Sequence, residues 1–186
     1  MARTPSTMSP LGTPCPDFDL PDPRGGRSGR DAAMGEHGLL VMFICNHCPF
    51  VIHIAEALAD LGRTYPARGI GVVAISSNDV PNYPDDSPEK MVEECSLRGY
   101  EFPYLFDETQ EVAKAFDAAC TPDFFLYDRD GVLVYRGQLD ASRPGNDEPV
   151  TGADLGAAMD ALIAGEAITS EQIPSLGCNI KWKATT

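Results

Sequence analysis

One short stretch of the chain constrains the fold more than any other. The continuous apolar run 39–44 is followed at once by the motif Cys-Asn-His-Cys-Pro at 45–49. Six apolar residues are too few for a stable helix and suit a β-strand that is buried on both faces. From 50 to 65, apolar residues recur at spacings of three and four, which predicts an amphipathic helix. The motif is therefore expected at a strand-to-helix junction of an α/β fold.

The rest of the chain continues the alternation of strands and helices. Asp128 to Gly131 separates two apolar runs and is typical of the turn of a hairpin. Parallel crossovers early and an antiparallel hairpin late predict a mixed central β-sheet with helices on both faces. Besides 39–44, the predicted strands are 71–76, 104–106, 124–127 and 132–135, and the later helices are 88–98, 109–116 and 151–164.

The length of 186 residues fits one domain and is short for two. We therefore expect a single domain over 1–186, with an N-terminal arm at 1–16 and a C-terminal tail at 171–186 that packs on the domain. Residues 1–38 are rich in Pro and Gly and predict irregular structure, in which 17–20 is the only strand-like fragment. The tail has no clear period.

The charge of the chain bears on its partners and location. A formal net charge of -14 disfavours binding to nucleic acid or to anionic membranes. No run approaches the ~20 apolar residues of a membrane span, and the N-terminus has no apolar core of a secretory signal. We expect a cytoplasmic protein. One acidic run predicts a solvated loop and helix face: Asp85, Asp86, Glu89, Glu93 and Glu94.

Cys45 and Cys48 form the candidate catalytic pair. Placed in a first helical turn, residues i and i+3 lie ~5–6 Å apart on one face, which suits a disulfide. The helix N-terminus favours a thiolate, the reactive form of cysteine. Pro49 loses little by lacking an N–H there. A protonated His47 would stabilise the thiolate further and make the pair more oxidising.

A second feature is the sequence Cys120-Thr121-Pro122 directly before a predicted central strand. A proline there calls for a reason, and a cis Thr121–Pro122 peptide that aims residue 121 at an extended peptide would supply one. A trans-proline loop is the alternative. Cys120 and Cys178 are candidate additional redox thiols, and buried thiols without a redox role are the alternative for both.

Metal binding is a further alternative for the motif. Cys45, His47, Cys48 and Cys120 offer ligand types suited to zinc or copper. However, the sequence has no second Cys-x-x-Cys and no His-x-x-x-His at a finger spacing. We therefore expect neither a metal nor another cofactor.

Taken together, these motifs resemble the thioredoxin-like superfamily. Within it, the chain is similar to the alkyl hydroperoxide reductase/thiol-specific antioxidant (redoxin) group, and more narrowly to peroxiredoxin-like proteins with a Cys-Asn-His-Cys-Pro active site. The resemblance implies a thioredoxin-like fold and an antioxidant or redox-homeostasis role. The stretches that carry it are 12–21, 45–49, 77–79, 83–89, 121–122, 135–140, 143–146 and 174–183.

The resemblance implies two reactions. In thioredoxins the first cysteine attacks and the second resolves, which gives Cys45 and Cys48 those roles, with Asn46, His47, Pro49, Thr121 and Pro122 as support. In peroxiredoxins the peroxidatic cysteine corresponds to Cys48. Compared with peroxiredoxins, however, this chain has Cys45 in place of a threonine and Pro122 in place of an arginine, and both differences favour disulfide exchange.

Three functions therefore stay open at this point. The leading one is a thiol–disulfide oxidoreductase. The first alternative is a thiol-dependent peroxidase in which Cys48 becomes a sulfenic acid that Cys45 or Cys178 resolves. The second is a metal-binding or redox-sensing module. The expected partners are protein or small-molecule disulfides, hydroperoxides for the peroxidase, and a thiol electron donor.

Overall fold

The structure, a computed structural model, describes residues 3–169 and 171–184, so residues 1–2 of the predicted arm and 185–186 of the predicted tail lie outside it. Its centre is a five-stranded sheet in the order β6-β5-β4-β8-β9. Strand β4 pairs in parallel with β5 and antiparallel with β8, so the sheet is mixed, as predicted. The strands are β4 (Gly38–Phe43), β5 (Ile70–Ser76), β6 (Tyr104–Phe106), β8 (Asp123–Asp128) and β9 (Leu133–Tyr135).

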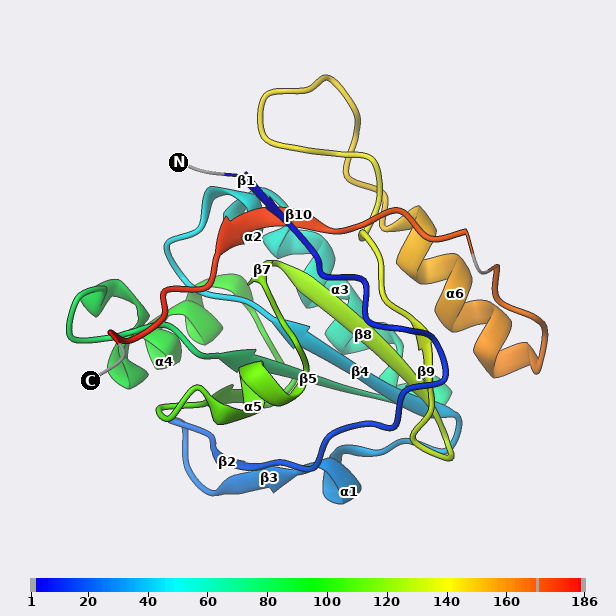
Figure 1. Cartoon of the computed structure of the whole chain (residues 1–186), viewed down its shortest axis with the longest axis horizontal. Helices are drawn as coiled ribbons and strands as arrows, with labels where there is room; N and C mark the ends of the chain where they lie inside the picture. The colour runs from blue at the N-terminus through cyan, green and yellow to red at the C-terminus, as the bar shows by residue number, and fades with distance from the viewer. Residues whose placement is uncertain (1–2, 170, 185–186) are drawn as a thin grey trace.

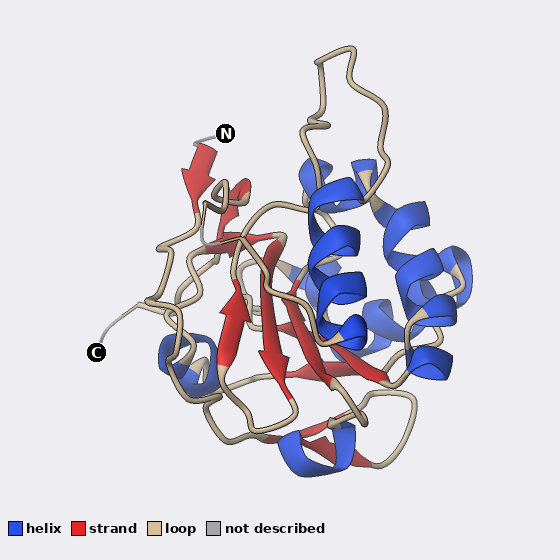
Figure 2. Cartoon of the chain, turned by 90° about the vertical axis from the view of Figure 1, so that its right-hand side faces the viewer, coloured by secondary structure: helices blue, strands red, loops and turns tan. Residues whose placement is uncertain are grey.

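Helices cover both faces of this sheet, which confirms the predicted architecture (Figures 1 and 2). Alternate residues of β4 point into two separate apolar cores, since Leu40 belongs to one and Leu39 to the other. One core is closed by α2 (Pro49–His53), α3 (Ala55–Thr64), α4 (Pro88–Arg98) and α6 (Ala153–Ala164). The other is closed by α5 (Glu111–Ala115) and α1 (Arg30–Ala33).

Two elements differ from the prediction in instructive ways. The helix predicted over 50–65 is two helices, because the backbone at Ile54 leaves the helical region (φ -106°, ψ 8°). The irregular N-terminal region contains short pairings that its Pro and Gly content conceals. These are β2 (Asp19–Pro21) with β3 (Arg27–Gly29), and β1 (Arg3–Pro5), which lies within the predicted arm. Single-turn 3-10 helices lie at Pro66–Arg68 and Pro84–Asp86.

The C-terminal tail contains a strand, β10 (Leu176–Asn179), that the sequence pattern does not reveal. It is the middle strand of a small antiparallel sheet, β1-β10-β7, in which β7 is Cys120–Thr121. In Figure 1 the red β10 and blue β1 lie side by side next to β7. The tail therefore packs on the domain, and the arm reaches it there.

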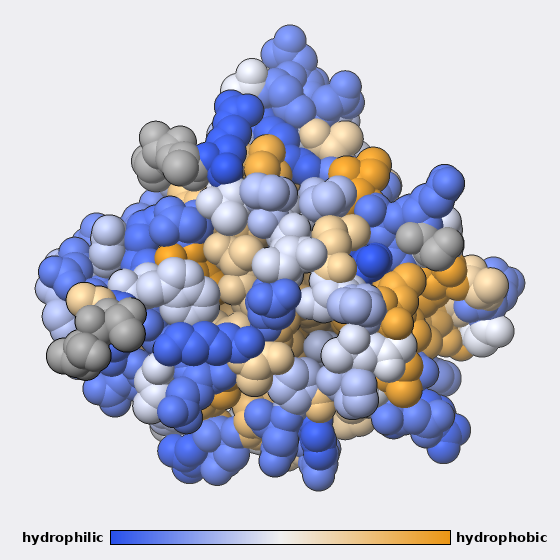
Figure 3. Space-filling view, in the orientation of Figure 1, coloured by the Kyte–Doolittle hydropathy of each residue, from blue (hydrophilic) through white to orange (hydrophobic). Residues whose placement is uncertain are grey.

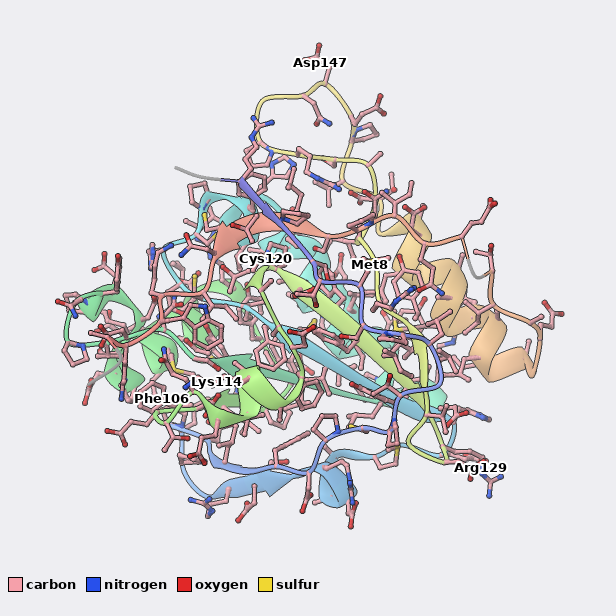
Figure 4. All side chains as sticks on the ribbon, viewed as in Figure 1. Met8, Phe106, Lys114, Cys120, Arg129 and Asp147 are labelled. Atoms are coloured by element: carbon pink, nitrogen blue, oxygen red, sulfur yellow. The ribbon has the colours of Figure 1, made fainter. Side chains whose placement is uncertain are left out.

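The surface agrees with the acidic composition of the chain. Blue, hydrophilic residues dominate the rim of the face in Figure 3, and orange, hydrophobic residues gather where α6 lies. The long connection 136–152, with Asp147 at its tip, projects from the domain (Figure 4). Across the described residues, no helix combines the length and apolar character that a membrane span needs.

Candidate active site

The Cys-x-x-Cys motif lies at the end of β4, as predicted, but before the helix rather than in its first turn. Cys48 is the N-cap of α2, with extended backbone (φ -72°, ψ 121°), and Pro49 is the first helical residue. Proline is favoured there because its missing N–H would have no partner inside the helix. Cys45 therefore lies in the loop between β4 and α2, and helical i, i+3 geometry does not bring the two thiols together.

Cys48 is fully buried, with 0% of its surface exposed. Its Sγ lies 3.1 Å from the carbonyl oxygen of Thr121 and 3.0 Å from Sγ of Cys178. Cys45 is 2% exposed, and its Sγ lies 3.4 Å from Oγ1 of Thr121. Three thiols from three separate segments thus meet around Thr121.

The two motif cysteines differ in acidity. A hydrogen bond from the Cys45 thiol lowers the pKa of Cys48 well below that of an ordinary thiol, and the contact with Cys178 adds to this, although burial opposes it. The pKa of Cys45 is raised, first by its hydrogen bond to the Cys48 thiolate and then by burial. Of the two thiols, Cys48 is the one whose ionisation to the nucleophilic thiolate is favoured.

Asp86 is a buried acceptor that contacts two residues of the motif, Asn46 and His47. Its carboxylate, 0% exposed, accepts hydrogen bonds from the backbone N–H of Asn46 at 2.8 Å and from the side chain of Asn78 at 2.7 Å. It also forms an ion pair with Nδ1 of His47 at 2.7 Å. Asn46 in turn accepts a hydrogen bond from Tyr104 at 3.0 Å. The prediction that Asp86 belongs to a solvated acidic face is therefore wrong, since a run of acids alone cannot tell which member turns inward.

His47 forms an ion pair with Asp86. The Asp86 carboxylate raises the pKa of His47, although burial opposes the shift. Its ring stacks on Tyr83 with centroids 5.8 Å apart, and Nζ of Lys181 lies 5.6 Å from the centre of the Tyr83 ring. The His47 side chain is partly exposed, at 24%, in contrast to the two buried cysteines of the motif.

The Thr121–Pro122 peptide is cis, which decides between the cis and trans alternatives that the sequence left open. The backbone of Thr121, expected to face an extended peptide, pairs with Cys178 of β10. The chain's own tail therefore occupies the edge at which a bound peptide was anticipated.

The structure separates the two additional cysteines. Cys178 touches Cys48, whereas Sγ of Cys120 lies 3.4 Å from the carbonyl oxygen of Pro122. Cys120 is labelled in Figure 4 beside β10. Burial raises the pKa of Cys120 above any physiological pH, so its thiol stays protonated.

A different set of residues from the predicted one has the spacing of a metal site. Among the described residues, potential ligand atoms of Cys45, His47 and Asp86 lie within 4.8 Å of one another. Cys48 and Cys120, which the sequence suggested, are not members. Sulfur, nitrogen and oxygen donors suit zinc, but three ligands do not close a structural site.

A cysteine pair after the first central strand, a cis-proline loop opposite it and a mixed sheet between helices define a thiol redox protein on a thioredoxin-like fold. The model of the AhpC/TSA family matches residues 11–136, and the chain belongs to this family. Among proteins with curated descriptions, none matched the chain.

Two solved structures are similar to this chain over nearly its whole length. An uncharacterized conserved protein from Geobacillus kaustophilus is 50% identical, with a TM-score of 0.98 over 100% of this chain and 99% of that one. A hypothetical protein from Sinorhizobium meliloti is 50% identical, with a TM-score of 0.93 over 98% and 100%. The peroxidoxin BcpB from Mycobacterium tuberculosis shares the fold at 20% identity, with a TM-score of 0.62 over 83% and 96%.

Proposed function

We propose that this protein is a thiol–disulfide oxidoreductase in which Cys48 attacks and Cys45 resolves. The observation that carries the proposal is the place of Cys48 at the start of α2, with its sulfur 3.1 Å from the carbonyl oxygen of Thr121 and 3.0 Å from Sγ of Cys178; its lowered pKa supports the same assignment. Cys45 donates a hydrogen bond that stabilises the Cys48 thiolate, and its own pKa is raised by the same contact. These roles are the reverse of those implied by the likeness to thioredoxins.

The proposed reaction has two exchange steps. The Cys48 thiolate attacks one sulfur of a substrate disulfide, forms a mixed disulfide and releases the other sulfur as a thiolate. That thiolate takes the proton of Cys45, whose sulfur then attacks Cys48 and releases the second substrate sulfur as a thiolate, which takes a proton from solvent. The substrate gains two electrons and two protons, the chain holds a Cys45–Cys48 disulfide, and an external thiol donor restores the dithiol.

Two nearby groups support this assignment. A cationic His47 stabilises negative charge on Cys48, and the Asp86 carboxylate favours the protonated, positively charged imidazole. The carboxylate also raises the pKa of Cys45 through its negative charge, after the larger effects of Cys48 and burial. The site therefore concentrates thiolate character on one sulfur.

A peroxidase is the second candidate, because full burial of Cys48 favours a small oxidant over a bulky one. A hydroperoxide would transfer one oxygen to Cys48, giving a sulfenic acid and an alcohol, and Cys45 would then form the disulfide with release of water. Pro122, where peroxiredoxins carry an arginine, weakens this candidate.

Two variants test the proposed roles. We expect Cys48→Ser to abolish reduction of both insulin and a small aromatic disulfide. The double variant Cys45→Ser/Cys178→Ser should accumulate a mixed disulfide on Cys48, because the Cys178 sulfur, 3.0 Å from that of Cys48, can otherwise resolve it. Cys95→Ser, which removes a buried thiol in α4, serves as the matched control and should keep full activity. Full activity of Cys48→Ser would disprove the proposal.

Stopped-flow measurement of hydroperoxide consumption separates the two candidates. A rate no faster than that of free cysteine would exclude the peroxidase. A fast rate that depends on Cys48, combined with failure to reduce either disulfide, would replace the leading proposal by the second.

A further inference from the structure

Strand β10 lies on the redox site as a bound peptide would. Cys178 is the register partner of Thr121, the residue before the cis proline, and Asn179 is the partner of Cys120. Before this pairing in the chain, the Ser175 hydroxyl donates to the carbonyl oxygen of Pro122 at 2.7 Å. After it, the Ile180 N–H donates to the carbonyl oxygen of Ala119 at 3.1 Å. Main-chain pairing along one edge is the way in which strand-forming peptides are recognised.

The contact between β10 and the proline loop requires a glycine. A Cβ at Gly177 would overlap the carbonyl oxygen of Thr121 and would lie 3.0 Å from the nitrogen of Pro122. These are backbone atoms, which cannot turn aside as the end of a side chain can. The close approach at Gly177 places the following residue, Cys178, directly over Cys48.

The next residues fix this placement. The backbone N–H of Lys181 donates to Asn78 at 2.8 Å, and the Lys181 carbonyl accepts from Asp79 at 2.9 Å. The N–H of Lys183 donates to the side chain of Gln110 at 2.8 Å. The Cys178 sulfur, 3.0 Å from that of Cys48, is thus held from both sides of β10.

We propose that Cys178 is an internal exchange partner of Cys48, and that β10 presents it in the place of a substrate cysteine. The inference rests on the proposed function, since it needs an oxidised Cys45–Cys48 pair. The Cys178 sulfur attacks Sγ of Cys48, and its proton passes to Cys45 as that sulfur leaves. The Cys48–Cys178 bond forms as the Cys45–Cys48 bond breaks, and the electron pair of the broken bond leaves on Cys45. The step is an isomerisation that consumes neither oxidant nor reductant.

The position of β10 limits which substrates can reach the site. While β10 is paired with β7, it occupies the edge of β7 on which Thr121 pairs, so an extended protein segment cannot pair with Thr121 there. A small disulfide or hydroperoxide needs no strand pairing. We therefore assign small oxidants, rather than extended polypeptides, as the substrates of the seated form.

Mapping of disulfides in the full chain tests the relay. Trypsin leaves Cys45 and Cys48 together in peptide 31–63, Cys178 in 137–181 and Cys120 in 115–129. After oxidation with one equivalent of diamide, Cys45→Ser should yield the 31–63/137–181 cross-link within monomers. Wild-type protein should yield this cross-link together with the internal Cys45–Cys48 disulfide.

Two pairs of variants control the result. In the Cys45→Ser background, Cys120→Ser should keep the cross-link and Cys178→Ser should remove it. Gly177→Ala should reduce the cross-link severalfold with every cysteine in place. Gly156→Ala adds the same methyl group on α6, where the nearest atom is a Tyr65 hydroxyl at 3.5 Å, and should leave the cross-link unchanged.

Activity distinguishes failure of the relay from failure of the proposed function. If wild type reduces the small aromatic disulfide and Cys48→Ser does not, but Cys45→Ser forms no cross-link to Cys178, the relay is wrong and the proposed function stands. If Cys48→Ser reduces that disulfide as fast as wild type, both are wrong.

Discussion

Asp86→Asn is the substitution that tests the electrostatics of the site most directly. The carboxylate accepts hydrogen bonds from Asn46 at 2.8 Å and Asn78 at 2.7 Å, and Nδ1 of His47 lies 2.7 Å from it in an ion pair. An asparagine keeps one acceptor oxygen and turns an NH2 group toward the remaining donors. Hydrogen bonds to a charged group contribute about 1.5–3 kcal/mol each, and relief of the buried charge offsets part of this loss. We expect the free energy of unfolding to fall by about 2–4 kcal/mol in mildly acidic buffer.

The expected loss depends on pH in a defined direction. The pKa of His47 is raised, so its stabilising contribution is complete below its unfolded pKa, about 6.5, and is lost as pH rises through the folded value. Burial would raise the pKa of Asp86, but the bonds from His47 and Asn78 lower it. Its contribution is therefore present above about pH 4 and is lost as pH falls through the lowered value. The two windows overlap between about pH 4 and 6.5.

Urea unfolding of wild type and Asp86→Asn at about pH 5 and about pH 9 measures this dependence. Asp85→Asn is the matched control, because Asp85 is exposed and the substitution removes the same charge one residue away. We expect the wild-type advantage over Asp86→Asn to be larger at the lower pH, with little change for the control. An advantage of equal size at both pH values would refute the assigned His47–Asp86 pair.

Three further predictions follow from other parts of the structure. Burial raises the pKa of Asp123 to about 6, so its ionisation destabilises the fold as pH rises from about 4 to above 6. The free energy of unfolding of Asp123→Asn, measured relative to wild type in urea, should therefore rise by about 2–3 kcal/mol from acidic to alkaline pH. A difference of equal size at both pH values would contradict this. Gly177→Ala should lower the free energy of unfolding by about 1–3 kcal/mol through overpacking, whereas Gly156→Ala should raise it by up to about 1 kcal/mol through helix propensity. Thermal melts in which Gly177→Ala is the more stable variant would disprove the close contact of Gly177 with the backbone of Thr121. Phe116→Ala, which removes the centre of a cluster with Phe43 and Phe125, should cost about 3–5 kcal/mol in denaturant titrations, and a loss below about 1 kcal/mol would exclude that packing.

Local patterns were sufficient to predict the central sheet. The apolar run of β4, the helix 88–98 between Ser87 and Gly99, and the hairpin of β8 and β9 carry their own signals of period, capping and turn. An unusual proline before a central strand drew attention to the Thr121–Pro122 peptide, but only the structure decides that it is cis. These features depend on residues that are close in sequence.

What was missed depends on long-range contacts. Strand β10 has four residues and no alternation, and it forms because β1 and β7, both far from it in the sequence, pair with its two edges. Asp86 looks like its exposed neighbours until the fold places Asn46 and Asn78 against it. Local sequence could name both motif cysteines but could not rank their acidity, because the ranking depends on burial and on each other.

The β1-β10-β7 sheet also bears on the order in which the protein is completed. Strand β10 follows every other described strand in the chain, and its partner β1 precedes them all. On the ribosome, β4, β5 and the hairpin are available for pairing long before residues 176–179 emerge. The Cys48 thiol is thus uncovered in the nascent chain and becomes enclosed only when the last strand is added, so synthesis itself passes through a stage at which this sulfur is open to its surroundings.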